Sequence, residues 1–517
     1  MSSREIHVVV VGGSWAGVTA VHDLMQLSHL TYPRLHITLV EQRTHYFHKT
    51  GIIRGLADKK YAEQMFIPYN RVFSHSGMSN PNHRFVCARL RHVHENFIEV
   101  EGGGRLFFDY LILATGTEYK SLPVTSSTTA EECYTQYQAM RLAMEAANRI
   151  LFVGGGAVGV GLCGEIAEMY PKKTITLVHA REKLLNQDIS DSFATTTEIR
   201  LQKMGVNVVL GESVVPPDFG ADVIYSTGAP PGAYANSDRK NTLGDAASIA
   251  PSVATSVVPH SAMVSPSSAY SAGVSPTTAV NDSIPHNNSI AMSVAGNGTV
   301  NEEKMRGMYH HFAPSAAPSI VSSVSSSDPQ SHKYRFQWVV QPQEVVTQTG
   351  RHIECDLTVW TTGSRPQTGF MKTLMPSSEK RPLVDRASGS ILVRPTLQLA
   401  DPKYPHIFAV GDVNSLSISE KYATSAVNQA KRAVENIKTL IDDCYDFRIK
   451  MSTAMARETA SKAMLIPYTG TKKGVVVALG KNQEVSNTWF AKINSWARGG
   501  KRGRKYLIDK AQKMLNY

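Results

Sequence analysis

The sequence predicts an α/β protein that contains the same strand–turn–helix–strand unit twice. Three observations predict this fold class: apolar segments alternate between strand-like and helix-like periods, a glycine-rich turn follows the first strand of each unit, and one sharp change in composition marks an insertion. The expected strand, helix and strand segments are 6–11, 16–27 and 36–40 in the first unit, and 150–153, 158–169 and 174–178 in the second.

Size and charge set the first limits. The chain has 517 residues, enough for about three domains. Its 54 Lys and Arg residues exceed its 43 Asp and Glu residues, and the net charge of +11 favours anionic partners such as nucleotides, anionic lipid or nucleic acid. The first expected strand begins at Ile6, and no run of 18 apolar residues is present. We therefore expect a cytoplasmic protein that is not secreted and has no spanning helix.

Residues 241–330 differ in composition from the rest of the chain. Ser and Pro account for 27 of these 90 residues, seven are charged, and neither a helix period nor a strand period is present. Such a segment buries too little apolar surface to offset the entropy that is lost on ordering. The sequence therefore predicts a disordered insertion over residues 217–333, either a passive loop expansion or a regulatory segment that is phosphorylated.

The first glycine-rich turn is typical of dinucleotide binding. Its residues are Gly12, Gly13, Ser14, Trp15, Ala16 and Gly17. Such a turn lets the backbone approach a pyrophosphate and directs the positive end of a helix at it. Glu41 stands at the end of the next strand, 24 residues after Gly17, where a carboxylate can accept hydrogen bonds from ribose hydroxyls. Ser14 replaces the middle glycine of the usual pattern.

The second turn matches the pattern fully. Its three pattern glycines are Gly154, Gly156 and Gly159. The strand-end position, 20 residues after Gly159, holds His179 in place of an acid. An acid there would repel the 2′-phosphate of NADPH, and His179, followed by Arg181 and Lys183, does not. The alternative is that His179 caps the strand and that the two cations are solvated.

Cysteine and histidine spacing excludes several other chemistries. The five cysteines include no C-x-x-C pair, which argues against a dithiol–disulfide reductase and a zinc ribbon. The 18 histidines include no H-E-x-x-H motif. We therefore expect no metal site.

Further segments resemble those of flavoproteins that bind two dinucleotides. Ala114, Thr115 and Gly116 form a segment that resembles the turn where the chain of these flavoproteins comes back to the FAD. A similar turn, which ends at Gly363, would belong to the nicotinamide domain. Val86 lies in a segment similar to the strand that meets the adenine, and Asp412 ends a segment similar to the motif that binds the ribitol chain. The resemblance implies two Rossmann-like domains in a glutathione-reductase-like fold, FAD held non-covalently, and NADH or NADPH as substrate.

Within these flavoproteins the chain resembles the apoptosis-inducing-factor-2 and ferroptosis-suppressor group, which is related to type II NADH:quinone oxidoreductases. The resemblance places Arg54 near the FAD, Lys421 beside the flavin, and Glu165 where it could hydrogen-bond the nicotinamide amide. Many relatives carry a Glu where this chain has Gly161. The alternative is that Glu165 is a solvated helix residue and Lys421 a surface cation.

The resemblance also implies a division into domains and an activity. We expect a FAD domain over 1–120 and 385–445, a nicotinamide domain over 121–384, and a basic C-terminal region over 446–517. The implied activity is hydride transfer from NAD(P)H to flavin and electron transfer to a quinone. A soluble electron carrier is the alternative acceptor. A nucleotide-sensing or DNA-binding flavoprotein is the alternative class, although no nucleic-acid motif is present and nucleic acid is not the expected partner.

The C-terminal region has features of a segment that binds a membrane surface. Trp489, Ile493 and Trp496 recur at helical spacing and are followed by a basic stretch. Tryptophan and basic residues together favour an anionic lipid surface, which would place the protein peripherally on a membrane such as the mitochondrial outer membrane or a lipid droplet. The alternative is that the tryptophans pack against the FAD domain.

Overall fold

The fold was analysed in a computed structural model of the whole chain. The described residues are 5–74, 81–119, 128–185, 189–214, 340–417, 421–446, 464–470, 476–480, 484–486 and 508–517. All of them fall in one compact unit, which comprises residues 1–228 and 325–517. The expected insertion over 217–333 lies outside the described residues.

A five-stranded parallel sheet forms the first half of the fold. Its order is β18 (Ile407–Ala409), β9 (Tyr110–Leu113), β1 (Ile6–Val11), β2 (Leu35–Glu41) and β5 (Arg84–Cys87). Side chains alternate along β1, so Val8 and Val10 join one core cluster and Val9 and Val11 the other. Both faces are therefore buried, which explains the uninterrupted run of valines.

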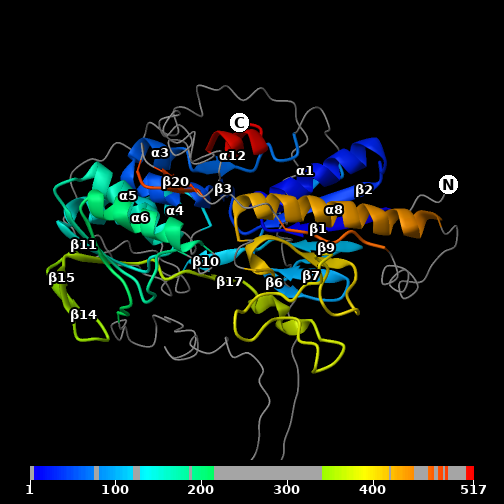
Figure 1. The fold of residues 1–517 in the computed structure, drawn as a ribbon. Coiled ribbons are helices and arrows are strands. Elements are labelled where there is room, and N and C mark those ends of the chain that lie inside the picture. The colour runs from blue at the N-terminus through cyan, green and yellow to red at the C-terminus, as the bar shows by residue number, and fades with distance from the viewer. Residues whose placement is uncertain are drawn as a thin grey trace, which may run out of the picture. The chain divides into compact units, whose positions relative to one another are not determined.

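Two long helices lie side by side on this half. They are α1 (Trp15–Leu30) and α8 (Ala423–Asp446), which Figure 1 shows in blue and orange. Although α1 follows β1 directly, α8 comes from the distant end of the chain. The first dinucleotide unit is therefore completed by C-terminal residues.

A second parallel sheet repeats the arrangement. Its order is β13 (Val206–Val209), β12 (Thr174–Val178), β11 (Arg149–Val153) and β16 (Leu357–Trp360), with helices α5 (Ala157–Met169) and α6 (Asp191–Lys203). In both sheets the first strand of the unit lies between the second strand and a strand from further along the chain. This is the strand order of dinucleotide-binding folds, and it confirms the predicted fold class.

Two short strands link the parallel sheets. β10 (Thr117–Tyr119) follows the first sheet and pairs antiparallel with β17 (Ser364–Pro366), which follows the second. Each strand comes directly after one of the predicted Thr-Gly turns. The link therefore joins the two turn regions.

The two sides of the expected insertion are joined to each other. Val214 and Thr347 form an antiparallel bridge, and the Gln348 N–H donates to the Ser213 carbonyl oxygen at 2.8 Å. Thr347 and Gln348 lie in the connection of a hairpin formed by β14 (Gln343–Val346) and β15 (His352–Cys355). Described residues before and after the insertion thus meet directly.

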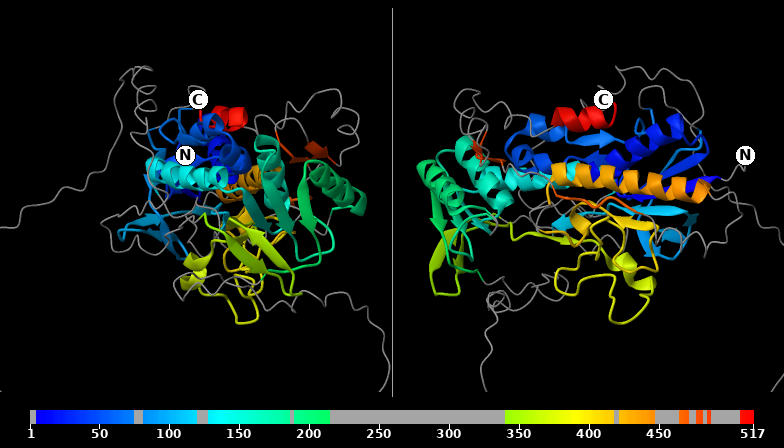
Figure 2. Two further views of the ribbon diagram at one scale, coloured as in Figure 1. Left: turned by 90° about the vertical axis from the view of Figure 1, so that its left-hand side faces the viewer. Right: turned by 45° about the vertical axis from the view of Figure 1, so that its right-hand side comes forward.

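The C-terminal helix packs on the first half of the fold. In α12 (Ile508–Met514), Ile508 and Ala511 are buried, as is the following Leu515, and Figure 2 shows the helix in red beside blue N-terminal elements. Trp489, Ile493 and Trp496 lie outside the described residues. A search of the described helices finds none whose length and apolar character would suffice to span a bilayer.

The remaining elements are short, apart from one helix of 17 residues. The helices are η1 (Lys49–Gly51), α2 (Ile52–Ala57), α3 (Lys59–Glu63), α4 (Ala130–Ala146), η4 (Gly369–Thr373) and η5 (Gly411–Val413). The strands are β3 (His45–Phe47), β4 (Phe66–Pro68), β6 (Leu90–Val93), β7 (Phe97–Val100), β8 (Arg105–Phe107), β19 (Val476–Ala478) and β20 (Glu484–Ser486).

Candidate functional site

The first glycine-rich turn packs against the Ala-Thr-Gly turn. Gly12 has a φ of 101°, and a side-chain carbon added there would overlap the carbonyl oxygen of Ala114. A side-chain carbon at Gly17 would overlap the Gly12 carbonyl. Glycine is therefore required at both positions, by backbone conformation at the first and by close approach at both.

Glu41 faces this turn from the end of β2. Its Oε2 accepts a hydrogen bond from the Gly13 N–H at 2.8 Å, and its Oε1 accepts one from the Arg43 N–H at 3.2 Å. The carboxylate is thus held beside the turn, as the sequence pattern predicts. Val86 lies opposite Val40 in the adjacent β2–β5 pair.

The start of α1 carries donors suited to an anionic ligand. Ser14 occupies the cap position without a side-chain capping hydrogen bond, and the first N–H groups of a helix have no partner within the helix. The Trp15 indole N–H is buried and has no hydrogen-bond partner among the described residues. A phosphate at this end would meet backbone donors and the positive end of the helix dipole.

The second turn repeats the geometry of the first. Gly154 has a φ of 113°, and a side-chain carbon added there would lie 2.7 Å from the Thr361 carbonyl oxygen. A side-chain carbon at Gly159 would overlap the Gly154 carbonyl. The structure therefore contains two equivalent turns, each packed against the turn that follows a neighbouring strand.

His179 occupies the position in the second unit that Glu41 occupies in the first. Its Nδ1 accepts from the Gly155 N–H at 3.0 Å, and the Arg181 Nε–H points at its Nε2 at 3.3 Å. Burial, together with the Arg181 charge, lowers the pKa of the imidazole to about 4. The ring is therefore neutral at physiological pH.

There is room beside both turns. A side-chain carbon added at Gly116, Gly156 or Gly363 would meet no atom of the described residues within 4 Å. These glycines border the two turns without filling the space in front of them. The donors and the space together fit a dinucleotide at each turn.

Asp412 lies in η5, and the charges of two lysines act on it. Burial raises the pKa of its carboxyl, while the charges of Lys421 and Lys49 oppose that rise. The Lys421 Nζ donates to the Asp412 carbonyl oxygen at 2.9 Å, and the Lys49 Nζ donates to the Thr117 carbonyl oxygen at 2.9 Å. Burial lowers the pKa of both ammonium groups to about 8.

Sequence reasoning missed Lys49. It is the first residue of η1 and lies five residues before Arg54. A sequence signal for this residue was available, because Lys49 is a charged residue in a stretch that is otherwise mostly apolar or buried. Its proximity to Asp412, however, depends on how the two ends of the FAD domain meet.

Arg54 and Glu165 bind each other. The Arg54 Nε and Nη2 donate to Oε2 and Oε1 of Glu165 at 2.7 and 2.6 Å, and Nη2 also donates to the Gly480 carbonyl oxygen at 2.9 Å. Both side chains are 2% exposed. The pair joins α2 to α5, so these residues are brought together as an ion pair. The cofactor contacts expected for each of them separately stay predictions.

Gly161 allows α2 to approach α5 closely. A side-chain carbon there would lie 2.5 Å from Cδ1 of Ile53, so Ile53 occupies the space that a larger residue would need. At Gly164, one turn later, a side-chain carbon would lie 2.6 Å from the Leu479 Cα. These two glycines let Ile53 and the β19 segment pack against one helix.

The repeated turns, their strand order and the paired linker define the class of protein. Residues 6–223 match the profile of the family described as pyridine nucleotide-disulphide oxidoreductase. These residues, which are less than half of the chain, are therefore similar to a domain of this class, and the resemblance inferred from the motifs is confirmed at this level.

Two curated relatives make the similarity more specific. Apoptosis-inducing factor homolog B of Dictyostelium discoideum is 28% identical over 228 residues, which cover 42% of this chain and 55% of the relative. Ferroptosis suppressor protein 1 of Homo sapiens is 27% identical over 215 residues, which cover 41% of this chain and 54% of the relative. The chain thus matches about half the length of these relatives.

A solved structure supports the fold of the described residues. The sulfide:quinone oxidoreductase of Aquifex aeolicus has a TM-score of 0.53 and 12% identity, covering 98% of this chain and 92% of that one. At this identity the likeness concerns the fold alone.

Proposed function

We propose that this protein is an FAD-dependent NAD(P)H oxidoreductase that passes electrons to a quinone-type acceptor. One observation carries the proposal. In each of the two glycine-rich turns, the N–H of the second glycine donates a hydrogen bond to the side chain at the end of the next strand. That side chain is Glu41 in the first unit and His179 in the second. Two such sites suit two dinucleotides, a resident flavin and a nicotinamide substrate.

The first unit is the proposed FAD site. When bound, FAD would accept a hydride from NAD(P)H and release electrons onward. The start of α1 and the Trp15 N–H would meet the pyrophosphate, Glu41 the ribose hydroxyls, and Asp412 the ribitol chain. Val86, Arg54 and the turn Ala114–Gly116 complete the proposed set, and the open space at Gly116 supports it.

The second unit is the proposed nicotinamide site, and its donors suit NADPH as well as NADH. A neutral imidazole has one acceptor nitrogen, yet both the Gly155 N–H and the Arg181 Nε–H point at His179. One of these donors is therefore left for another acceptor. A 2′-phosphate offers such an acceptor and would meet no negative side chain at this position.

The two lysines beside Asp412 give the proposed flavin site a positive potential. A cation placed where negative charge develops lowers the barrier to forming that charge. Lys421 is the proposed catalytic cation, and Lys49 adds a second positive charge that also acts on Asp412. Glu165 is proposed to act through Arg54, because both of its carboxylate oxygens accept from that guanidinium.

The thiols of the chain do not favour a disulfide acceptor. Burial raises the pKa of the described thiols of Cys87, Cys133, Cys163 and Cys355, which opposes the thiolate that disulfide exchange requires. With no C-x-x-C pair in the sequence, a quinone is the acceptor that the resemblance supports.

One experiment tests the flavin and the electron donor together. The purified full-length chain should show a flavin visible band, which should bleach without oxygen on addition of NADH and of NADPH. Folded protein that shows no flavin absorbance, even after FAD is added, would contradict the proposal.

Steady-state assays test the acceptor. NADPH oxidation should accelerate with a short-chain quinone more than with a soluble iron–sulfur carrier protein. Faster turnover with the carrier would favour the alternative reductase function. A gel shift that weakens steeply with salt, together with negligible turnover on either acceptor, would favour a nucleic-acid-binding flavoprotein.

We also propose that the C-terminal region contacts an anionic membrane surface. The support is the sequence alone: the tryptophans at 489 and 496 and the basic residues that follow. A peripheral position would give a reductase access to a quinone dissolved in the bilayer. Helix α12 at the end of this region packs on the protein through Ile508 and Ala511, so the contact is proposed for the tryptophans and basic residues before it.

A further inference from the structure

We propose that Glu5, His7 and His36 form a binding site for a divalent transition metal, of which Zn²⁺ is the representative ion. The residues lie at the amino-terminal ends of β1 and β2, whereas the glycine turns follow the carboxyl ends. With ~3.3 Å per strand residue, His7 is roughly 16 Å from Gly12. The site is therefore separate from the proposed dinucleotide sites.

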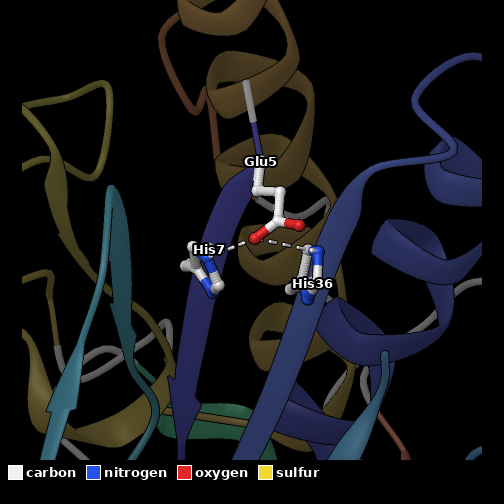
Figure 3. A group of neighbouring side chains, drawn as sticks. All are labelled: Glu5, His7 and His36. Carbon is white, nitrogen blue, oxygen red and sulfur yellow. Dashed lines mark ion pairs between the residues drawn. The ribbon is translucent and has the colours of Figure 1, made fainter. Parts of the chain in front are cut away.

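Strand pairing brings the three side chains together. His7 and His36 are direct partners across the parallel β1–β2 pair, and their ring centroids are 4.6 Å apart. Glu5 lies two residues before His7, so it points to the same side of the strand. Figure 3 shows the carboxylate between the two imidazoles.

The distances approach those of a coordination shell. Oε2 of Glu5 lies 3.7 Å from Nε2 of His7 and 3.8 Å from Nε2 of His36, and one ligand atom from each residue lies within 4.8 Å of the others. A tetrahedral ion with bonds of ~2.1 Å needs ligand atoms about 3.4 Å apart. Side-chain rotations that shorten the two Glu5–histidine distances by a few tenths of an ångström would bring them to this value.

The three side chains form no hydrogen bond between the carboxylate and either imidazole. Both separations exceed hydrogen-bond length, so the carboxylate does not hydrogen-bond either imidazole. The charge of Arg84 acts on His36, and this positive charge opposes a bound cation.

The ligand set and its exposure define the class of ion. Two imidazoles and one carboxylate suit Zn²⁺, Co²⁺, Ni²⁺ and Cu²⁺ better than Mg²⁺ or Ca²⁺, which prefer oxygen ligands. The side chains of Glu5 and His7 are 57% and 45% exposed, against 19% for His36. Solvent can therefore supply a fourth ligand.

Sequence spacing could not reveal this site. His7 and His36 are 29 residues apart and belong to no metal-binding motif. Their proximity follows from the register of the two strands. This proposal differs from the expectation, based on the sequence alone, that the protein has no metal site.

Co²⁺ binding to the purified full-length chain tests the proposal. Wild-type protein, treated with chelator and dialysed, should bind Co²⁺ with a visible d–d absorption band that Zn²⁺ abolishes and excess Mg²⁺ does not. His7→Gln and His36→Gln should each weaken Co²⁺ binding at least about tenfold, the lower end of losses caused by removing even an outer-shell group.

His352→Gln is the matched control. His352 Nδ1 lies 3.0 Å from Oε1 of Glu344, a His–Glu pair on the exposed hairpin, so its loss should leave the Co²⁺ band unchanged. Circular dichroism and the flavin band verify that each variant is folded. If His7→Gln and His36→Gln keep wild-type Co²⁺ affinity, or if wild type shows no Zn²⁺-sensitive band, the proposal is wrong, whatever the oxidoreductase assays show.

Discussion

Glu41 and His179 occupy equivalent positions in the two units but differ in charge. Each side chain ends the second strand of its unit and accepts the N–H of the turn's second glycine. The hydrogen bond explains why an acceptor is needed at that position. The hydrogen bond does not fix the charge of that side chain, and we propose that the charge influences which nucleotide the turn prefers.

His179→Glu should shift preference toward NADH. The introduced carboxylate can accept the Gly155 N–H, as Glu41 accepts that of Gly13, and would repel a 2′-phosphate. We expect the ratio of kcat/KM for NADH to that for NADPH to rise at least about tenfold, or ~1.4 kcal/mol. Stopped-flow reduction with both nucleotides measures this. If wild type already rejects NADPH by about a hundredfold, the role assigned to His179 is wrong.

Lys421→Met should weaken the electrostatic support of the flavin. Because the pKa values of Lys421 and Lys49 are about 8, both side chains are charged at pH 7 and lose that charge as pH rises through 8. Wild-type flavin reduction should therefore fall between pH 7 and 9. The variant should be about tenfold slower at pH 7, ~1.4 kcal/mol, with a shallower alkaline fall.

The control for this pH profile is Lys438→Met. Lys438 is a half-exposed helix residue that pairs with Asp442. It should keep the wild-type rate and the wild-type alkaline fall. Equal profiles for Lys421→Met and wild type would remove Lys421 from the catalytic proposal.

At the scale of elements, helices α2 and α5 are joined by one buried ion pair. Arg54 is 1% exposed, and Glu165 supplies both oxygens that receive its guanidinium. Glu165→Ala would leave a buried charge without its counter-ion, which typically costs about 3–5 kcal/mol. We expect the melting temperature to fall by at least about 5 °C.

Glu354→Ala is the matched control for Glu165→Ala. Glu354 pairs with Arg149, but its side chain is 74% exposed, so its loss should cost roughly 0–1 kcal/mol. Thermal unfolding followed by circular dichroism compares the two variants. A similar small effect in both would mean that the Arg54–Glu165 pair contributes no more than a surface pair.

At the scale of the whole molecule, the insertion should be dispensable for folding. The Val214–Thr347 bridge and the Arg351–Glu212 ion pair, at 2.7 Å, tie its two flanks together. A variant lacking residues 217–333 should therefore fold and keep the wild-type ratio of flavin to protein. In the full chain, limited proteolysis should cut first between 217 and 333. A protected insertion, or a deletion variant that loses flavin, would contradict this expectation.

Membrane contact is best tested by substitution. A truncation before Ser486 would also remove α12, whose Ile508 and Ala511 are buried, and would confuse membrane contact with folding. The wild-type chain should float with anionic vesicles at low salt, and Trp489→Ser combined with Trp496→Ser should reduce flotation severalfold. Unchanged flotation, or flotation lost together with flavin, would indicate that the tryptophans serve another role.

The sequence by itself determined the two-copy architecture and the positions of both turns. These features are local: strand and helix periods, glycine after a strand, and an acceptor at the next strand's end can each be read within about 30 residues. The strand order in both sheets then follows from the rules for such units. For the same reason, Glu41 and His179 lie beside their turns as the spacing predicts.

Only the tertiary structure decided which distant residues meet. Arg54 and Glu165 are 111 residues apart, and their ion pair depends on the packing of α2 against α5. Lys49 approaches Asp412 only because the last strand of the first sheet comes from the far end of the chain. His7 and His36 meet through strand register, which no motif encodes. Such contacts depend on how complete elements pack, and a local pattern carries no information about that packing.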